Sequence, residues 1–202
     1  MIGDETSSAS IYTLSEKFEE AFQTAFKLHR RQNRKSTTVP YIAHLMSVSA
    51  LVLEFGGNET EAIAALLHDA VEDQGGMPVL VDIEKRFGKK VADIVLGCSD
   101  SSGLPKPPWE QRKKNYIEHL QTAGKSVLLV SLADKLHNLK DILMTYRRIG
   151  EQTWERFSGG RAGTLWYYGE LVEIFSQVGQ PDLVAEFGRT YETVLRLSEG
   201  NE

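Results

Sequence analysis

The stretch Leu66-Leu67-His68-Asp69-Ala70-Val71-Glu72-Asp73 joins an apolar helix to a cluster of four ionisable side chains. Residues 62–67 are apolar enough to be a buried helix segment. If that helix continues, His68 and Asp69 lie one turn before Glu72 and Asp73, and all four side chains point into one sector of the helix surface. Carboxylates that gather at the edge of a dry interior repel one another and are costly without a partner. A divalent cation would relieve both costs, although a local hydrogen bond is the ordinary explanation of an adjacent His68–Asp69 pair.

Two further residues are candidate ligands of the same ion. Asp134 ends a nearly unbroken apolar run, residues 127–133, and a carboxylate in a buried position needs a partner or a metal. His44 follows Pro40 in the first turn of an expected helix, where proline is favoured. A histidine at that place could equally cap or pack the helix.

The spacing of apolar residues predicts helices almost throughout, because they recur at intervals of three and four and alternating strand-like runs are scarce. Glycine and proline mark several of the breaks, as at Gly75-Gly76 and Gly88. We expect an all-α bundle of about nine to ten helices without substantial sheet. It would form a single compact domain over residues 11–200, after a disordered segment at residues 1–10 and with its longest internal loop at residues 99–108. The expected helices span residues 14–32, 40–54, 59–73, 78–87, 89–98, 109–122, 126–147, 161–177 and 181–198.

Composition excludes several classes of protein. The chain has 202 residues, of which 41% are hydrophobic and 25% charged, as in an ordinary globular domain. Its net charge of −5 argues against a nucleic-acid partner. The polar amino terminus and the lack of an apolar run of about 18 residues predict a cytoplasmic protein without a membrane segment. The single cysteine, Cys98, cannot form an internal disulfide and is expected to be buried.

The candidate ligands stand in an order that resembles a known family. His44, the pair His68-Asp69 and the distant Asp134 resemble the pattern of the HD superfamily of metal-dependent phosphohydrolases. The sequence motifs around them resemble those of the alarmone hydrolase domain of RelA/SpoT proteins, and the resemblance covers roughly residues 15–175. These motifs are HRRQNRK at 29–35, PYIAH at 40–44, HDAVED at 68–73 and ADKLHNLK at 133–140. The resemblance implies an HD-type helical fold in which His44, His68, Asp69 and Asp134 bind the metal.

The resemblance also implies an activity. We expect a small stand-alone alarmone hydrolase that removes the 3′-pyrophosphate from (p)ppGpp, or from adenosine counterparts such as ppApp, and releases pyrophosphate. Two imidazoles and two carboxylates suit Mn²⁺, and the resemblance points to the same ion, while the ligand types leave Fe²⁺, Co²⁺ and Zn²⁺ open. The alternatives are another HD nucleotide phosphohydrolase and a catalytically silent alarmone-binding sensor. The base preference and the oligomeric state are left open.

Further roles follow from the resemblance, and each has an ordinary alternative. Glu72 and Asp73 correspond to a catalytic pair that positions or deprotonates the attacking water, or they are a solvated helix end that opposes the helix dipole. Arg34 and Lys35 correspond to a basic pair in the nucleotide pocket, or they are a solvated helix end. Asn138 would contact the nucleoside. Lys140 would contact a phosphate, but a surface role fits it equally well.

Overall fold

The structure, a computed structural model, describes residues 13–100 and 107–200. Within these ranges the chain forms ten α-helices and one 3-10 helix, and an isolated bridge between Asn33 and Pro40 is the sole β pairing. The predicted all-α fold is therefore confirmed. The predicted disorder at residues 1–10 and the middle of the predicted loop, residues 101–106, lie outside the described residues. The helices are α1 (Glu16–His29), α2 (Ile42–Glu54), α3 (Glu59–Leu67), α4 (Ala70–Gln74), α5 (Met77–Phe87), α6 (Lys89–Cys98), α7 (Trp109–Gln121), α8 (Lys125–Ile149), the 3-10 helix η1 (Gly150–Arg156), α9 (Gly160–Phe175) and α10 (Pro181–Ser198).

Two elements differ from the predicted ones. The predicted helix over residues 59–73 is divided, because α3 ends at Leu67 and α4 begins at Ala70. The imidazole of His68 donates through Nδ1 to the carbonyl of Ala65 at 2.8 Å, and a continuous helix would use that carbonyl for the amide of Asp69. The backbone of Asp69 has φ −94° and ψ −1°, which is a turn geometry rather than a regular helical one. The 3-10 helix η1 was not predicted at all.

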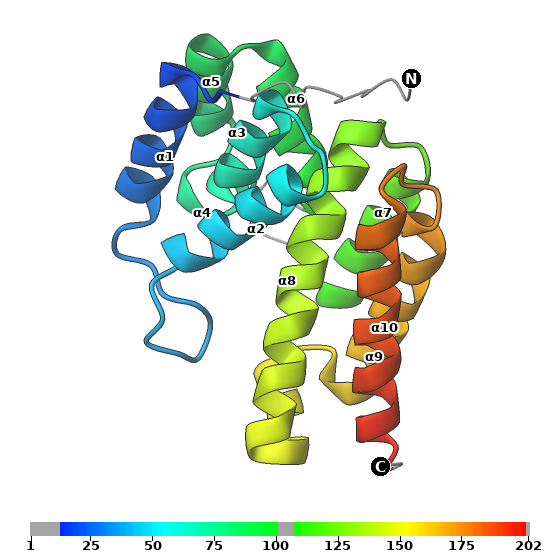
Figure 1. The fold of residues 1–202 in the computed structure, drawn as a ribbon. Coiled ribbons are helices and arrows are strands. Elements are labelled where there is room, and N and C mark those ends of the chain that lie inside the picture. The colour runs from blue at the N-terminus through cyan, green and yellow to red at the C-terminus, as the bar shows by residue number, and fades with distance from the viewer. Residues whose placement is uncertain (1–12, 101–106, 201–202) are drawn as a thin grey trace, which may run out of the picture.

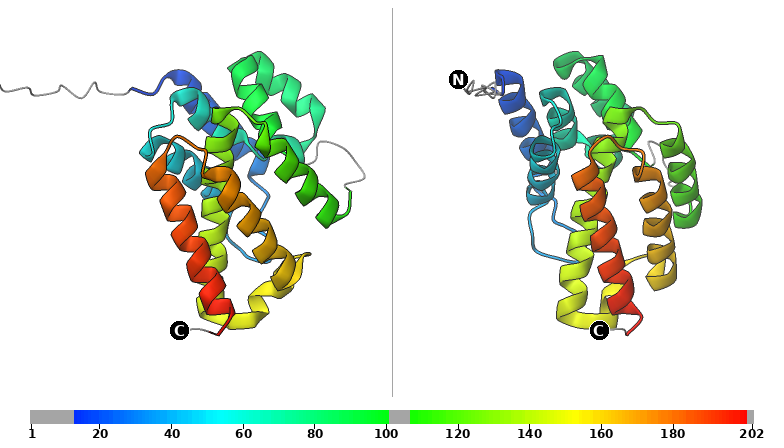
Figure 2. Two further views of the ribbon diagram at one scale, coloured as in Figure 1. Left: turned by 90° about the vertical axis from the view of Figure 1, so that its right-hand side faces the viewer. Right: turned by 45° about the vertical axis from the view of Figure 1, so that its right-hand side comes forward.

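Helix α8 is the axis around which the other helices are arranged (Figure 1). One end of α8 packs against α2, α3 and α6, and its other end lies beside η1, with α10 running alongside (Figures 1 and 2). Helix α9 packs against α10, and α7 packs against α9. The helices α1–α6 therefore lie on one side of α8 and the helices α7, α9 and α10 on the other, so residues of α8 can face both groups.

Helix α3 is the most deeply buried element of the first group. All six residues from Ala62 to Leu67 are at most 3% exposed, as expected for a helix that is apolar on every side. Its amino terminus is fixed by a capping box, in which the side chain of Asn58 accepts from the amide of Glu61 and the side chain of Glu61 accepts from the amide of Asn58. His68 directly follows this buried helix, so α3 positions its imidazole at the edge of the core.

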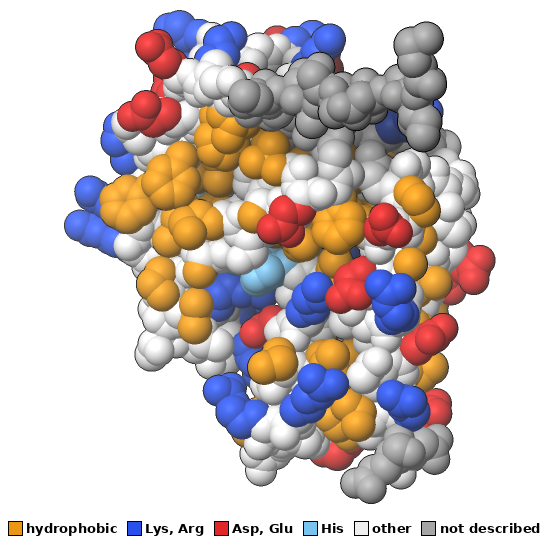
Figure 3. Space-filling view, in the orientation of Figure 1, with side chains coloured by type: hydrophobic (Ala, Val, Ile, Leu, Met, Phe, Trp, Pro, Cys, Tyr) orange, Lys and Arg blue, Asp and Glu red, His pale blue; other side chains and the backbone are white. Residues whose placement is uncertain are grey.

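The surface is mixed in character (Figure 3). Apolar side chains gather over α1, where Phe22 and Phe26 are 39% and 51% exposed, and lysines and arginines are interspersed with acids over the lower halves of α8 and α10. Among the described helices, none combines the length and the hydropathy that a membrane span requires.

Candidate metal centre and adjoining cavities

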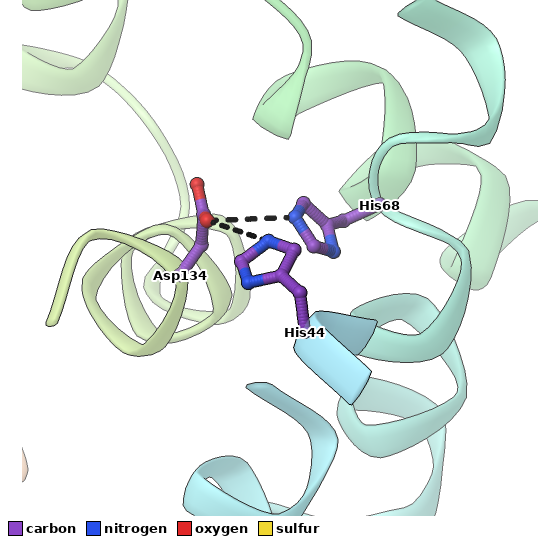
Figure 4. A group of neighbouring side chains, drawn as sticks. All are labelled: His44, His68 and Asp134. Carbon is purple, nitrogen blue, oxygen red and sulfur yellow. Dashed lines mark ion pairs between the residues drawn. The ribbon is translucent and has the colours of Figure 1, made fainter. Parts of the chain in front are cut away.

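Three helices bring two histidines and a carboxylate to one point (Figure 4). His44 comes from the first turn of α2, His68 follows the end of α3, and Asp134 lies in α8. Each offers one ligand atom, and these atoms all lie within 4.8 Å of one another. The Oδ1 atom of Asp134 is 3.2 Å from Nε2 of His44 and 3.6 Å from Nε2 of His68. All three residues are buried.

The hydrogen bonds of the two imidazoles decide which nitrogen is available to a ligand. Nδ1 of His68 carries a proton, because its partner is the carbonyl of Ala65, which can only accept. Nδ1 of His44 lies 2.9 Å from Nδ1 of His137, so one histidine donates to the other. The Nε2 atoms of both His44 and His68 are buried without a hydrogen-bond partner. Fixing Nδ1 in this way leaves the Nε2 lone pair of His68 directed at the cluster, which is the usual arrangement of a metal-binding histidine.

Asp69 faces the same two nitrogens from the turn between α3 and α4. Its Oδ2 atom is 3.0 Å from Nε2 of His68 and 3.6 Å from Nε2 of His44, and it accepts a 2.6 Å hydrogen bond from the hydroxyl of Tyr41. Its direction comes from the break in the helix rather than from the continuous helical face that the sequence suggested. The structure thus brings together all four predicted ligands.

The charges of the cluster favour a cation. Burial alone would lower the pKa of His68, but the carboxylates of Asp69 and Asp134 outweigh it and raise this pKa well above its ordinary value. Burial would likewise raise the pKa of each carboxyl group, yet for Asp69 the imidazoles of His68 and His44 hold the pKa well below its usual range. For Asp134, the ammonium of Lys135 and the two imidazoles have the same effect. The carboxylates are therefore charged and favour a cation beside them, and the two nitrogens and carboxylate oxygens fit a divalent metal ion in that place.

The predicted catalytic pair lies beside this cluster, with its two members in different surroundings. Glu72 is half-buried and lines a cavity together with Asp69. Asp73 is more exposed and accepts a 2.8 Å hydrogen bond from Nε2 of Gln32. Gln32 is itself held by Nδ1 of His29 at 2.8 Å. Of the two, Glu72 is the one that lines the cavity.

Two of the four predicted substrate residues form one hydrogen-bonded chain that ends at the metal centre. Arg34 donates through Nη2 to the side-chain oxygen of Asn138 at 2.7 Å, and Nδ2 of Asn138 donates to Oδ1 of Asp134 at 2.6 Å. Lys35 is exposed at the rim of the cavity that contains Glu72. Lys140 points elsewhere, because its Nζ pairs with Glu186 of α10 at 3.0 Å and it lines neither of the two adjoining cavities described next.

Two adjoining cavities open next to the cluster. The one with the acidic groups encloses about 270 Å³, and the one that contains Arg34 and Asn138 encloses about 200 Å³. They share four wall residues. The shared walls are Trp109, Lys113, Lys135 and Phe157.

None of these four residues was predicted as part of the site. Lys113 and Lys135 bring positive charge, and Lys135 forms an ion pair with Asp134. The adjacency of Lys135 to a predicted ligand and the basic run Arg112-Lys113-Lys114 were the signals in the sequence. No local pattern distinguishes Trp109, at the start of α7, or Phe157, between η1 and α9, from core aromatics.

A buried carboxylate fixes the cations of α7 at the cavity wall. Asp100 accepts from Arg112 Nη1 at 2.6 Å and from Lys113 Nζ at 2.8 Å, and its side chain is 8% exposed. Although burial favours the neutral acid, these two cations lower the pKa of Asp100 to about 2. The ammonium of Lys113 also lies over the ring of Tyr167, at 4.8 Å from its centroid.

Comparison with known proteins places this geometry among nucleotide hydrolases. Residues 21–165 match the sequence profile of the HD domain family. The chain is 39% identical over 126 residues to the guanosine-3′,5′-bis(diphosphate) 3′-pyrophosphohydrolase MESH1 of Xenopus tropicalis, which aligns 61% of this chain with 68% of that protein. It is 34% identical over 171 residues to a probable guanosine-3′,5′-bis(diphosphate) 3′-pyrophosphohydrolase of Synechocystis, which covers 80% of this chain and 22% of that protein.

A solved structure supports the same grouping. It is that of a metazoan orthologue of SpoT that hydrolyses ppGpp and plays a role in starvation responses. It matches with a TM-score of 0.75 at 27% sequence identity, over 90% of this chain and 97% of that one.

Proposed function

The chain belongs to the HD domain family, and on this premise we propose that it is a metal-dependent (p)ppGpp 3′-pyrophosphohydrolase. The observation that carries the proposal is the convergence of two imidazoles and two carboxylates beside a cavity with four cationic side chains. Those cations are Lys35, Arg112, Lys113 and Lys135. A pyrophosphate is a small group of high negative charge, and such a cavity suits it.

We propose His44, His68, Asp69 and Asp134 as ligands of the metal, and Mn²⁺ as the metal, since it accepts both imidazole nitrogen and carboxylate oxygen. When bound, the ion would polarise the phosphoryl group and lower the pKa of a water molecule. In the reaction, water adds to the phosphorus atom attached to the ribose 3′ oxygen. The bond between that phosphorus and the 3′ oxygen breaks, the 3′ oxygen takes up a proton, and pyrophosphate leaves.

The chain's own residues divide the remaining tasks. Glu72 lines the cavity beside Asp69, where its carboxylate can accept a proton from the attacking water. Asp73 accepts a hydrogen bond from Gln32 and so helps to orient the short helix α4, which carries both acids. Lys113 and Lys135 neutralise the phosphates between the two cavities. Arg34 and Asn138 bind the nucleoside from the second cavity, and Lys140, paired with Glu186, is better explained as a surface residue.

The first experiment is turnover by the metal-free protein with ppGpp and, separately, ppApp, with and without Mn²⁺. Mn²⁺-dependent release of pyrophosphate together with GDP or ADP would support the proposal and identify the preferred base. Release of orthophosphate would indicate another HD phosphohydrolase, and tight binding without turnover would indicate a sensor.

A pair of variants separates metal binding from proton transfer. Asp69→Ala is expected to lose both bound metal and hydrolysis, whereas Glu72→Gln keeps the metal and loses most of the rate, on the order of 10²–10⁴-fold. Metal content is measured by elemental analysis and rate by pyrophosphate release. The matched control is Glu192→Gln, the same change at an exposed position of α10. Equal metal loss in Asp69→Ala and Glu72→Gln would contradict the assigned roles.

A further inference from the structure

Trp109 stands between the two adjoining cavities. It is the first residue of α7 and is half-buried. Its side chain lines the cavity of the acidic groups, the cavity of Arg34 and Asn138, and a separate outer cleft between α7 and α9. It is the one residue that all three of these spaces share. A molecule that occupies both adjoining cavities would lie beside its indole and the three other shared wall residues.

The indole of Trp109 packs closely against two glycines, Gly159 and Gly163. A Cβ atom on Gly159 would lie 2.5 Å from Cη2 of Trp109, and a Cβ on Gly163 would lie 3.0 Å from the same atom. Gly159 precedes α9 and has an ordinary backbone conformation, with φ −82°. Gly163 lies inside α9, where glycine is less favourable than alanine. Close approach of the indole is a physical reason for both glycines, and the ring of Trp166 meets Trp109 edge-on from the outer side at 6.5 Å between centroids.

The chemistry of the two cavities differs on either side of the indole. The cavity with Asp69 and Glu72 is rich in cations and suits phosphates. The cavity with Asn138 shares Lys113 and Lys135 with it and has Arg34 of its own, but it adds Thr164 and Tyr168, so beside its cations it offers amide, hydroxyl and aromatic surfaces. An indole has no positive charge to offer a phosphate, but it has a large apolar surface for a flat ring or a sugar.

From this juxtaposition we propose that Trp109 is a specificity-determining residue, a rigid wall against which the nucleoside of the substrate packs. The inference rests on the proposed function and refines it, because it assigns the nucleoside to the side of the indole that contains Asn138. The two glycines act as positioning residues, since a side chain on either one would push the indole into the cavities.

The test measures nucleoside binding apart from hydrolysis. GDP, which has the nucleoside without the 3′-pyrophosphate, is titrated against the metal-loaded protein while tryptophan fluorescence is recorded. Quenching is expected in the wild type and is lost in Trp109→Phe. Aromatic–base contacts removed by alanine substitution cost about 1–3 kcal/mol, so Trp109→Ala is expected to raise both the GDP Kd and the KM for ppGpp roughly tenfold, with kcat changed less than about threefold.

Two further variants keep the test decisive if Trp109→Ala folds poorly. Gly163→Ala retains the indole but displaces it, and is expected to raise KM while circular dichroism stays that of the wild type. Trp166→Phe is the matched control, since Trp166 contacts the outer side of Trp109 and lines neither adjoining cavity, so Kd and KM should stay within about twofold. GDP quenching that persists in folded Trp109→Phe, together with an unchanged KM for ppGpp in folded Gly163→Ala, would overturn the inference.

The proposed function can fail separately. If the wild type hydrolyses ppGpp but GDP quenches no fluorescence of Trp109, the inference is wrong and the hydrolase assignment stands. If GDP quenches Trp109 and neither ppGpp nor ppApp is hydrolysed, the hydrolase assignment is wrong and Trp109 is the wall of a nucleotide-binding site.

Discussion

Replacing Asp100 by asparagine tests whether the cations of the cavity wall are held by one buried carboxylate. Asp100→Asn keeps the shape of the side chain and removes the charge that Arg112 and Lys113 share. Both cations would then remain in a protein wall, since their side chains are 17% and 18% exposed. We expect lower stability at neutral pH and a higher KM for ppGpp, because Lys113 is no longer fixed between the cavities.

The magnitude follows from the pKa of Asp100. This pKa falls from an ordinary value of 3.8 to about 2 in the folded protein, and one unit corresponds to about 1.4 kcal/mol, so the ionised carboxylate contributes about 2 kcal/mol. Because the folded pKa is depressed, this contribution is fully present above the unfolded pKa and is lost as the pH falls toward the folded value. By pH 3 about 1 kcal/mol of it should be gone.

Urea unfolding followed by circular dichroism at pH 7, 5, 4 and 3 measures this effect. The free energy of unfolding of Asp100→Asn should lie about 2 kcal/mol below that of the wild type at pH 7, and the gap should shrink by about half at pH 3. Other carboxyl groups titrate in both proteins and cancel in the difference. The control is Asp93→Asn, which breaks the exposed pair with Lys89 and should show little change at any pH. A gap for Asp100→Asn that is constant from pH 7 to pH 3 would refute the electrostatic reasoning.

Three other perturbations have defined outcomes. Tyr41→Phe removes the 2.6 Å hydrogen bond to Asp69 and should weaken metal binding by about 10–100-fold in calorimetric titration, and an unchanged affinity would show that this hydroxyl does not orient the ligand. Chelation of the metal should lower the melting temperature, since a ligand at 100 times its Kd stabilises by about 2.7 kcal/mol, and a melting curve indifferent to EDTA and to added Mn²⁺ would argue against a metal at this site. Leu66→Ala, at a position 1% exposed in α3, should lower the free energy of unfolding by about 2–5 kcal/mol in urea, and a loss below 1 kcal/mol would mean that the α3 core repacks around the cavity.

The sequence predicted the helices well where local signals end them. Gly88 separates α5 from α6, and Pro181 starts α10, so the predicted boundaries there match the structure closely. The break between α3 and α4 was missed, because it depends on the imidazole of His68 reaching a carbonyl three residues earlier, and neither residue is a helix breaker. The 3-10 helix η1 has no strong local signal.

The candidate ligands could be selected from sequence because each combines a metal-binding side chain with an apolar neighbourhood. Their convergence needed the fold, since His44, His68 and Asp134 come from three different helices. The cavity walls show the limit of local reasoning. Trp109 lies in a polar helix and becomes recognisable as a site residue only when the fold packs Gly159 and Gly163 against it.

Helix α8 sets a fixed distance within the proposed active site. Asp134 and Asn138 are one helical turn apart, which corresponds to a rise of about 6 Å along the axis. If Asp134 binds the metal and Asn138 the nucleoside, helix α8 fixes the position of the sugar relative to the metal and hence to the scissile phosphate. A 5′-pyrophosphate has one more carbon between its first phosphorus and the ribose ring than a 3′-pyrophosphate, so with the nucleoside held at Asn138 that phosphorus would be displaced from the metal ligands.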